Sequence, residues 1–348
     1  MNRQPATPSI EDGIAWYDAK DWGAEGKGWS DTPGPFDRLP ARAEPLICPD
    51  VWGLSLHSAG LFVRFETSAT NLEFRHTVRS DRLAMPHMAA TSVSGIDVYR
   101  RDEHGRSRWV AVSKPEARDV RLRIENVDAP SSGTCCYTVY LPLYNGVESL
   151  RIGVPESCDF DPIPPRTDPP IVFYGTSIMQ GACASRSGMS IPSILERRLD
   201  RPMINLGFSG RGRMEPEFAK LIAEIDAALF VIDCVPNMPA ETIDANAQPL
   251  VHTLRSEHAD TPILLVEDRT YTHSQFYATA CETNSTRREA LRRAFERLVR
   301  DGVTGLHYLE GDHLLGDDGE ATVDSSHPTD LGMVRYADAY EVKLREIL

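Results

Sequence analysis

Two uninterrupted apolar runs in the second half of the chain constrain the fold more than any other feature of the sequence. They occupy residues 228–232 and 263–266. A strand that is apolar on both faces must be covered on both faces, which is typical of parallel sheets with helices on either side. The two runs therefore predict an α/β fold for this part of the chain.

The rest of the second half supplies the alternation that such a fold needs. Further strands are expected at residues 171–174, 202–205 and 305–309, and helices at residues 190–199, 215–225, 284–300 and 329–348. Five strands with helices between them predict a three-layer, doubly wound, flavodoxin-like parallel sheet. Ligands of such sheets bind at the carboxyl ends of the strands, so the turns after the strands are where chemistry is expected.

The first half has a different pattern, in which short β-type runs alternate with turn residues. The runs lie at residues 61–65, 72–75, 96–99, 109–112, 119–124 and 137–141. This spacing predicts an antiparallel sandwich of the jelly-roll type. All five tryptophans lie within the first 110 residues. They are expected in the core of the sandwich, with stacking on sugar rings as the alternative.

A proline-rich segment separates the two patterns. Residues 159–170 hold five prolines in twelve residues. Proline is excluded from helix interiors and central strands because it lacks the backbone N–H. We therefore predict a β-sandwich domain over residues 1–158, a linker over residues 159–170 and an α/β domain over residues 171–348.

Charge and cysteine content exclude several classes of function. The 51 acidic residues outnumber the 37 basic ones, for a formal net charge of −14, which repels nucleic-acid phosphates. The seven cysteines form no CxxC pair, which favours free thiols in the cytoplasm over disulfides or a zinc site. No membrane segment or signal peptide is recognisable. The expected partner is a small molecule or a carbohydrate, with no metal or cofactor; a homo-oligomer is left open.

Two turns carry side chains suited to nucleophilic chemistry. Ser177 lies in a glycine-flanked turn directly after the strand at 171–174, where a helix-capping serine is the alternative. Asp324 precedes His327 by three residues, so its carboxylate can fix the tautomer of the ring and leave Nε2 to accept a proton from a serine. The alternative for this second turn is a solvated loop.

Two further turns offer hydrogen-bond donors. Residues 205–212 are rich in glycine, and Asn237 follows the strand at 228–232. An oxyanion hole for acyl transfer needs donors that converge from separate loops. The glycine-rich turn lacks the Lys-Ser/Thr ending of a P-loop. Arg211 stands where a GxSxG motif around Ser209 needs its last glycine, which argues against an α/β-hydrolase elbow there.

Taken in order, these four segments resemble the conserved blocks of the SGNH (GDSL-like) hydrolase family. The matching blocks are residues 175–178, 205–210, 236–237 and 324–327. Two blocks depart from the family pattern. Gly-Thr-Ser replaces the more usual Gly-Asp-Ser, and Pro-Asn-Met replaces Gly-x-Asn-Asp. The first departure removes no catalytic group, whereas the second keeps the amide in a different loop.

The resemblance implies a serine esterase and assigns a role to each residue. Ser177 would be the nucleophile, His327 the general base and acid, and Asp324 the group that orients the histidine. The backbone N–H groups of Ser177 and Gly210, together with the side-chain amide of Asn237, would hold the oxyanion.

The combination of a β-sandwich with such a domain resembles two-domain carbohydrate esterases, which implies a small acyl group, such as acetyl, on a sugar. A lipase, a thioesterase, an acyltransferase and a non-catalytic carbohydrate-binding protein are the alternatives. An apolar loop at residues 83–88 interrupts the sandwich pattern. We expect its His87 and Met88 to contact the substrate, with an ordinary packed loop as the alternative.

Two charged segments carry no predicted function. The acidic residues after position 311 are expected in a solvated loop, with calcium binding as the alternative; they are Asp312, Asp317, Asp318 and Glu320. The helix at 284–300 has an arginine-rich face, which is expected to be solvated or to form a dimer contact.

Overall fold

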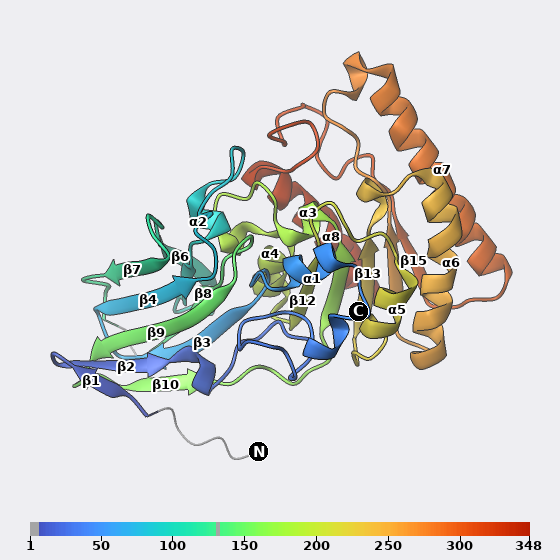
Figure 1. Cartoon of the computed structure of the whole chain (residues 1–348). Coiled ribbons are helices and arrows are strands. Elements are labelled where there is room, and N and C mark those ends of the chain that lie inside the picture. Colours follow the sequence, from blue (N-terminus) through green and yellow to red (C-terminus); the bar gives the residue numbers. More distant parts are fainter. Residues whose placement is uncertain (1–6, 130–132) are drawn as a thin grey trace. The chain divides into compact units, whose positions relative to one another are not determined.

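The computed structural model describes residues 7–129 and 133–348, and the chain forms two compact units (Figure 1). The first unit comprises Met1–Leu39, Leu56–Thr167 and Ser185–Gly188, and the second comprises Pro40–Ser55, Asp168–Ala184 and Met189–Leu348. Each unit therefore takes a segment from the part of the chain that mainly builds the other. The predicted division of the chain at a single linker does not include these two exchanged segments, Pro40–Ser55 and Ser185–Gly188.

The first unit contains two five-stranded sheets whose paired strands are all antiparallel. One sheet has the order β1 (Ser9–Glu11), β2 (Ile14–Asp18), β9 (Val147–Pro155), β4 (Leu72–Val78) and β7 (Asp119–Ile124). The other has the order β10 (Phe160–Ile163), β3 (Phe62–Thr67), β8 (Cys135–Tyr140), β5 (Asp97–Arg101) and β6 (Ser107–Val112). The predicted β-sandwich is confirmed.

Stacked aromatic rings fill part of the core of this sandwich. The ring of Phe65 lies 5.4 Å from that of Tyr137 and 4.9 Å from that of Phe160, centroid to centroid. Along β4 the side chains alternate between buried and half-buried, as expected for a strand with one face on a core. Alternation of this kind made β4 recognisable from the sequence.

Four strands of the first unit were not expected, and one of them corrects the predicted linker. β10 lies within residues 159–170 and pairs with β3 at the edge of its sheet. An edge strand tolerates Pro162 because one side of its backbone needs no partner. The prolines thus exclude a central strand here but not an edge strand. The other three unexpected strands are β1, β2 and β9.

The five tryptophans lie in three different settings. Trp16, Trp22 and Trp29 are buried in the first unit, as predicted. Trp109 is 50% exposed on β6, an edge strand, so the prediction of a core position is wrong for this residue. The prediction is also wrong for Trp52, which lies on α1 (Pro49–Ser55) of the second unit and is half-buried.

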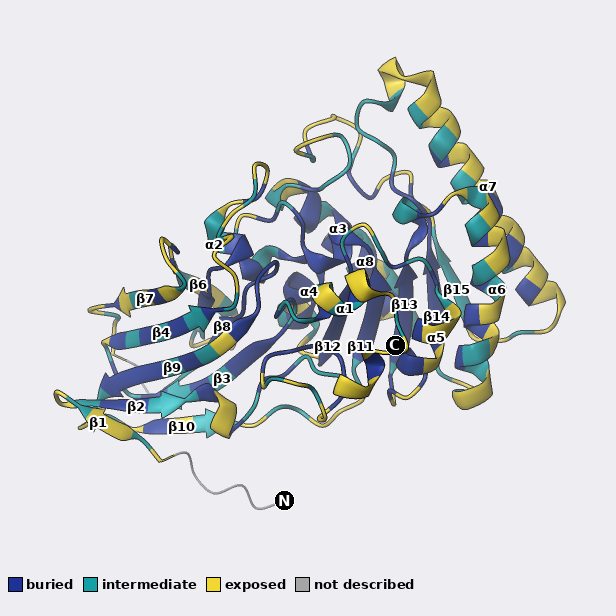
Figure 2. Cartoon of the chain, in the orientation of Figure 1, coloured by how far each residue is buried: buried dark blue, intermediate teal, exposed yellow. Residues whose placement is uncertain are grey.

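The second unit contains a five-stranded parallel sheet with the strand order β12-β11-β13-β14-β15. The strands are β11 (Ile171–Gly175), β12 (Met203–Gly207), β13 (Leu229–Asp233), β14 (Ile263–Val266) and β15 (Leu306–Leu309). This is the flavodoxin-like order, and it confirms the predicted fold class. Figure 2 shows the first four of these strands buried along their length, whereas β15 at the edge is half-buried.

The helices of the second unit pack in two groups. α4 (Ile191–Leu199) contacts α8 (Asp330–Ile347), and α6 (Ala240–Glu257) contacts both α5 (Pro216–Ile222) and α7 (Ala278–Arg300). α6 was not expected from the sequence. Its apolar face, which includes Ile243, Leu250 and Leu254, is buried even though Pro249 lies inside the helix, so tertiary packing outweighs the local effect of the proline.

Two further observations concern the cysteines and the membrane. All seven cysteines lie within the described residues, and each is a free thiol. Within residues 7–129 and 133–348, no helix is long and apolar enough to cross a bilayer.

Candidate active site

Ser177 lies on a sharp turn between β11 and the short helix α3 (Ser177–Gln180), and we name residues 175–181 the serine turn. Thr176 caps the helix, since its side chain accepts a hydrogen bond from Ile178 N at 3.3 Å. A Cβ atom on Gly175 would lie 2.6 Å from Met179 Cγ. The same atom would lie 2.8 Å from Asp233 O, so glycine leaves the room that β13 and Met179 occupy. The turn leaves Ser177 at the carboxyl end of β11, the strand between β12 and β13.

A second turn, residues 207–212, packs directly against the serine turn, and we name it the glycine turn. A Cβ atom on Gly207 would overlap with the backbone of Gln180, and one on Gly212 would overlap with the backbone of Gly175. Gly210 has a φ of +69°, in the left-handed region that favours glycine. Close backbone contact therefore holds the two turns together.

Asn237 adds a side-chain amide to the glycine turn. It ends the short 3-10 helix Val235–Asn237 after β13, and its Nδ2 donates a hydrogen bond to Arg211 O at 2.6 Å. An amide nitrogen carries two hydrogens, so one N–H is left for another acceptor. The structure thus brings together the turns that carry Ser177, Gly210 and Asn237.

The fourth predicted segment completes a hydrogen-bonded chain, and we name residues 322–328 the histidine loop. Ser177 Oγ lies 2.9 Å from His327 Nε2, and His327 Nδ1 lies 2.7 Å from Asp324 Oδ2. The other carboxylate oxygen of Asp324 accepts the backbone N–H groups of Ser326 at 3.1 Å and His327 at 2.8 Å. Two side chains 150 residues apart therefore meet as the sequence predicted.

The hydrogen bonds to Asp324 favour its ionised form. Partial burial alone would raise the pKa of the carboxyl group, but the bonds from the backbone and ring of His327 and from Ser326 N outweigh this effect and lower the pKa. A carboxylate that stays ionised can keep the Nδ1–H of the ring pointed toward it. The Nε2 atom is then the one that faces Ser177.

Comparison with known proteins places this chain in a family. Residues 168–345 match the model of the GDSL-like Lipase/Acylhydrolase family, and residues 14–160 match a model described as the N-terminus of Esterase_SGNH_hydro-type. The chain belongs to the GDSL-like lipase/acylhydrolase family. The predicted resemblance is thereby confirmed. No curated protein matches the chain in sequence.

Solved structures of the same architecture include a protein from Bacteroides ovatus described as a GDSL-like lipase. It is 32% identical, with 96% of this chain and 98% of that chain covered and a TM-score of 0.90. A salicylyl-acyltransferase from a tetracycline biosynthetic pathway is 18% identical over 100% of this chain and 98% of its own, with a TM-score of 0.74.

A family two carbohydrate esterase from Clostridium thermocellum, solved with cellohexaose, is 12% identical, with 83% of this chain and 92% of that chain covered and a TM-score of 0.58. At identities this low the last two structures share the fold alone.

Cys183 is a residue near the site of this GDSL-like chain that sequence reasoning missed. Burial raises the pKa of its thiol to about 12, and the nearby negative charge of Asp324 acts in the same direction. The thiol is therefore neutral at physiological pH and is a poor nucleophile beside Ser177. No spacing or motif in the sequence relates Cys183 to Asp324.

The segment Pro40–Ser55 also supports the site, which the sequence did not suggest. Asp50 on α1 forms an ion pair with Arg211 of the glycine turn, and Arg42 forms one with Glu224. All four residues belong to the second unit, although Arg42 and Asp50 lie between the sandwich strands β2 and β3 in the sequence. A segment from the first 55 residues therefore contacts the glycine turn through the ion pair between Asp50 and Arg211.

His87 and Met88 lie in the first unit, in a tight turn where Met85 and Met88 exchange two backbone hydrogen bonds of 3.0 Å. The side chain of Met88 is 5% exposed, and His87 is exposed. The tight turn explains the break in the strand pattern. Contact of these two residues with substrate stays a prediction.

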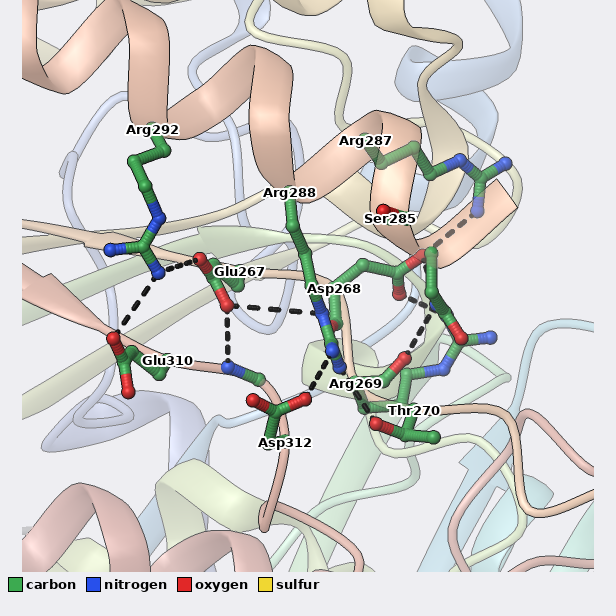
Figure 3. Close-up of polar contacts among 12 residues, drawn as sticks. Glu267, Asp268, Arg269, Thr270, Ser285, Arg287, Arg288, Arg292, Glu310 and Asp312 are labelled. Carbon is green, nitrogen blue, oxygen red and sulfur yellow. Dashed lines mark hydrogen bonds and ion pairs between the residues drawn. The ribbon is translucent and has the colours of Figure 1, made fainter. Parts of the chain in front are cut away.

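The arginine-rich face of α7 is not simply solvated. Figure 3 shows Arg287, Arg288 and Arg292 extending from the helix toward Glu267 and Asp268, which follow β14. Both of these acidic residues are buried. The prediction of a solvated face is wrong for Arg287 and Arg288, which are half-buried, whereas Arg292 is exposed and still pairs with Glu267. Buried carboxylates need such partners.

The acidic segment after residue 311 is also partly paired. Asp312 binds Arg288, and Asp318 binds Arg335 with an N···O distance of 2.7 Å. In the part of the chain that the structure describes, no group of three or more His, Cys, Asp or Glu side chains could hold a metal ion. The four acidic residues are exposed, which confirms the predicted solvated loop, and two of them also pair with arginines.

Proposed function

We propose that this protein is a serine esterase that hydrolyses small acyl esters, with an acetyl group on a carbohydrate as the favoured substrate. The observation that carries the proposal is the continuous hydrogen-bonded chain from Ser177 Oγ through the ring of His327 to Asp324, at 2.9 and 2.7 Å. Membership of the GDSL-like lipase/acylhydrolase family supports ester hydrolysis as the class of reaction.

The proposed reaction uses the three side chains in sequence. His327 Nε2 takes the proton of Ser177 as Oγ attacks the carbonyl carbon of the ester. The tetrahedral intermediate then expels the alcohol, which leaves with the proton from the imidazolium, and the acyl group stays on Oγ. Water attacks this acyl-enzyme, His327 takes the proton of the water and returns it to Ser177, and the carboxylic acid is released.

The negative oxygen of the tetrahedral intermediate needs donors that are already in place. We assign this role to the backbone N–H groups of Ser177 and Gly210 and to the second N–H of the Asn237 amide. The support is that the bond from Asn237 to Arg211 O orients the amide within the glycine turn. Donors held by backbone contacts need no rearrangement when the charge forms.

The carbohydrate part of the proposal has separate support. The structure from Clostridium thermocellum is that of a family two carbohydrate esterase in complex with cellohexaose, and it shares the fold at 12% identity. A neutral sugar ester also suits a chain with a net charge of −14, which disfavours anionic partners. Acyl transfer is the second candidate, because the salicylyl-acyltransferase has the same fold at 18% identity.

A panel of p-nitrophenyl esters of rising chain length, assayed beside acetylated sugars, tests the proposal. We expect turnover to be fastest with the shortest acyl groups and with an acetylated sugar. Ser177→Ala should lower kcat by about 10⁵-fold or more. Normal turnover in Ser177→Ala would overturn the proposal.

Two further measurements separate the rival functions. Acyl transfer predicts product only when an acceptor alcohol or amine is added, whereas hydrolysis needs only water. A non-catalytic binding protein predicts no labelling of Ser177 by an organophosphonate, whereas an esterase predicts labelling that Ser177→Ala abolishes.

A further inference from the structure

The histidine loop is supported by another loop, residues 267–272, which follows β14. Thr272 N donates a hydrogen bond to Ser325 O at 3.1 Å. Arg269 Nη2 donates to Ser326 Oγ, and its Nε lies 3.4 Å from Ser326 O. The second loop therefore contacts both residues that separate the carboxylate from the imidazole in the histidine loop.

Arg269 is a buried cation that bridges two partners. Its side chain is 1% exposed, forms an ion pair with Asp268 and lies 4.2 Å above the ring of Tyr271. Burial acts to lower the pKa of the guanidinium, but the charge of Asp268 together with Tyr336 and Tyr271 raises it. The planar guanidinium carries five N–H donors in a rigid fork. One rigid group can therefore bind the carboxylate and the serine together.

Helix α7 in turn holds Asp268 in place. The Oδ2 atom of this fully buried residue accepts hydrogen bonds from Arg287 Nη1 at 2.9 Å and from Asn284 Nδ2 at 3.1 Å. Arg288 Nε donates to the backbone oxygen of Asp268 at 2.8 Å (Figure 3). Asn284 also donates to Arg269 O at 2.8 Å. These bonds fix the counter-ion of Arg269, and Asn284 also fixes the backbone of Arg269 itself.

We propose that Arg269 is a positioning residue, which holds Asp324 and His327 in line with Ser177 by fixing Ser326. This inference rests on the hydrolysis proposed above. Ser326 N donates to the carboxylate of Asp324 at 3.1 Å, so a shift of Ser326 moves the group that orients the imidazole. Misplacing a catalytic group by about 1 Å can lower a rate about 100-fold.

Three variants test the link between Arg269 and Ser326. Arg269→Lys keeps a positive charge beside Asp268 but loses the fork, and we expect kcat to fall about 10- to 100-fold with KM changed by less than about twofold. Ser326→Ala leaves the buried ion pair intact, and we expect kcat to fall about 3- to 10-fold. The double variant should be no slower than Arg269→Lys alone, because both changes break one link.

Arg287→Gln is the matched control. It removes another ion pair from the same carboxylate of Asp268, and the Arg287 guanidinium binds Asp268 and Tyr271 rather than Ser326. We expect a lower melting temperature and a kcat within about twofold of wild type. A kcat within about twofold of wild type in Ser326→Ala, or losses that multiply in the double variant, would overturn the role of Arg269. Ser326→Ala gives this answer even where Arg269→Lys does not fold.

A measurement without substrate separates this role from the proposed function. The hydrogen-bonded proton between His327 Nδ1 and Asp324 should give a low-field proton NMR resonance, assigned by its loss in His327→Gln. We expect Ser326→Ala to weaken or shift the resonance and Arg287→Gln to leave it unchanged. If the wild type cleaves no ester but the resonance behaves in this way, the proposed function fails and the positioning stands. An unchanged resonance in Ser326→Ala overturns the positioning.

Discussion

The serine turn and the histidine loop bring their side chains within hydrogen-bonding distance, but different forces hold them. The serine turn is held by backbone atoms that approach too closely for any side chain at Gly175 or Gly207. The histidine loop is held by one backbone hydrogen bond from Thr272 and by the side chain of Arg269, with the buried charges behind it. The serine half of the site therefore depends on shape, and the histidine half depends on electrostatics. Different substitutions should damage the two halves.

Removing the charge behind the histidine loop should have the largest effect on stability. Asp268→Asn leaves the buried cation of Arg269 without its counter-ion, so we expect the free energy of unfolding to fall by about 3–5 kcal/mol. Urea denaturation followed by circular dichroism measures this change.

Asp244→Asn is the control, because the pair between Asp244 and Arg293 is about half exposed at 3.0 Å. Exposed pairs contribute about 0–1 kcal/mol. Equal losses in Asp268→Asn and Asp244→Asn would contradict the electrostatic half of the comparison.

Removing the amide beside the serine turn should impair catalysis without unfolding the protein. If Asn237 holds the oxyanion, Asn237→Ala should lower kcat about 100- to 1,000-fold. Steady-state kinetics with p-nitrophenyl acetate measures the loss. Asn246→Ala is the matched control. The side-chain amide of Asn246 also donates a hydrogen bond to a backbone oxygen, that of Arg213, at 3.0 Å, directly after the glycine turn. The same loss in both variants would point to a structural role.

Adding one methyl group to the glycine turn should disrupt the shape-dependent half. Gly207→Ala places a Cβ atom on the backbone of Gln180, and we expect a loss of about 1–3 kcal/mol in the free energy of unfolding. Gly53→Ala, on α1, meets no atom within 4 Å and should be neutral or stabilising by about 0.5–1 kcal/mol. Thermal and urea unfolding compare the two variants, and a neutral Gly207→Ala would refute the close contact.

Acid should remove part of the stability that the histidine loop contributes, and this is the smallest of the expected effects. The pKa of Asp324 is lowered in the folded state, so its ionised form stabilises the fold above the ordinary aspartate pKa of about 4. That contribution is lost as the pH falls through the lowered pKa. The difference in Tm between wild type and Asp324→Asn should therefore shrink below about pH 4. A difference that is constant from neutral pH to pH 3 would argue against the hydrogen bonds to this carboxylate.

Local patterns were enough to predict most of the second unit. The continuous apolar runs indicated β13 and β14, and the block spacing indicated the turns that carry Ser177 and His327. Patterns failed where an element has a weak local signal. α6 contains Pro249, and β10 lies in the proline-rich segment, so only pairing and packing show that these elements form.

The sequence by itself determined which functional groups follow one another along the second unit. They are a serine, a glycine turn, an amide and an Asp-x-x-His segment, each at the end of a strand or helix. Spacing along the chain is enough to predict such a local contact. A carboxylate three residues before an imidazole can reach the ring when the loop between them turns back. Only the tertiary structure decided what holds the histidine loop. Arg269 and Ser326 are 57 residues apart, and their contact depends on the packing of α7 against the end of β14, which no local pattern encodes.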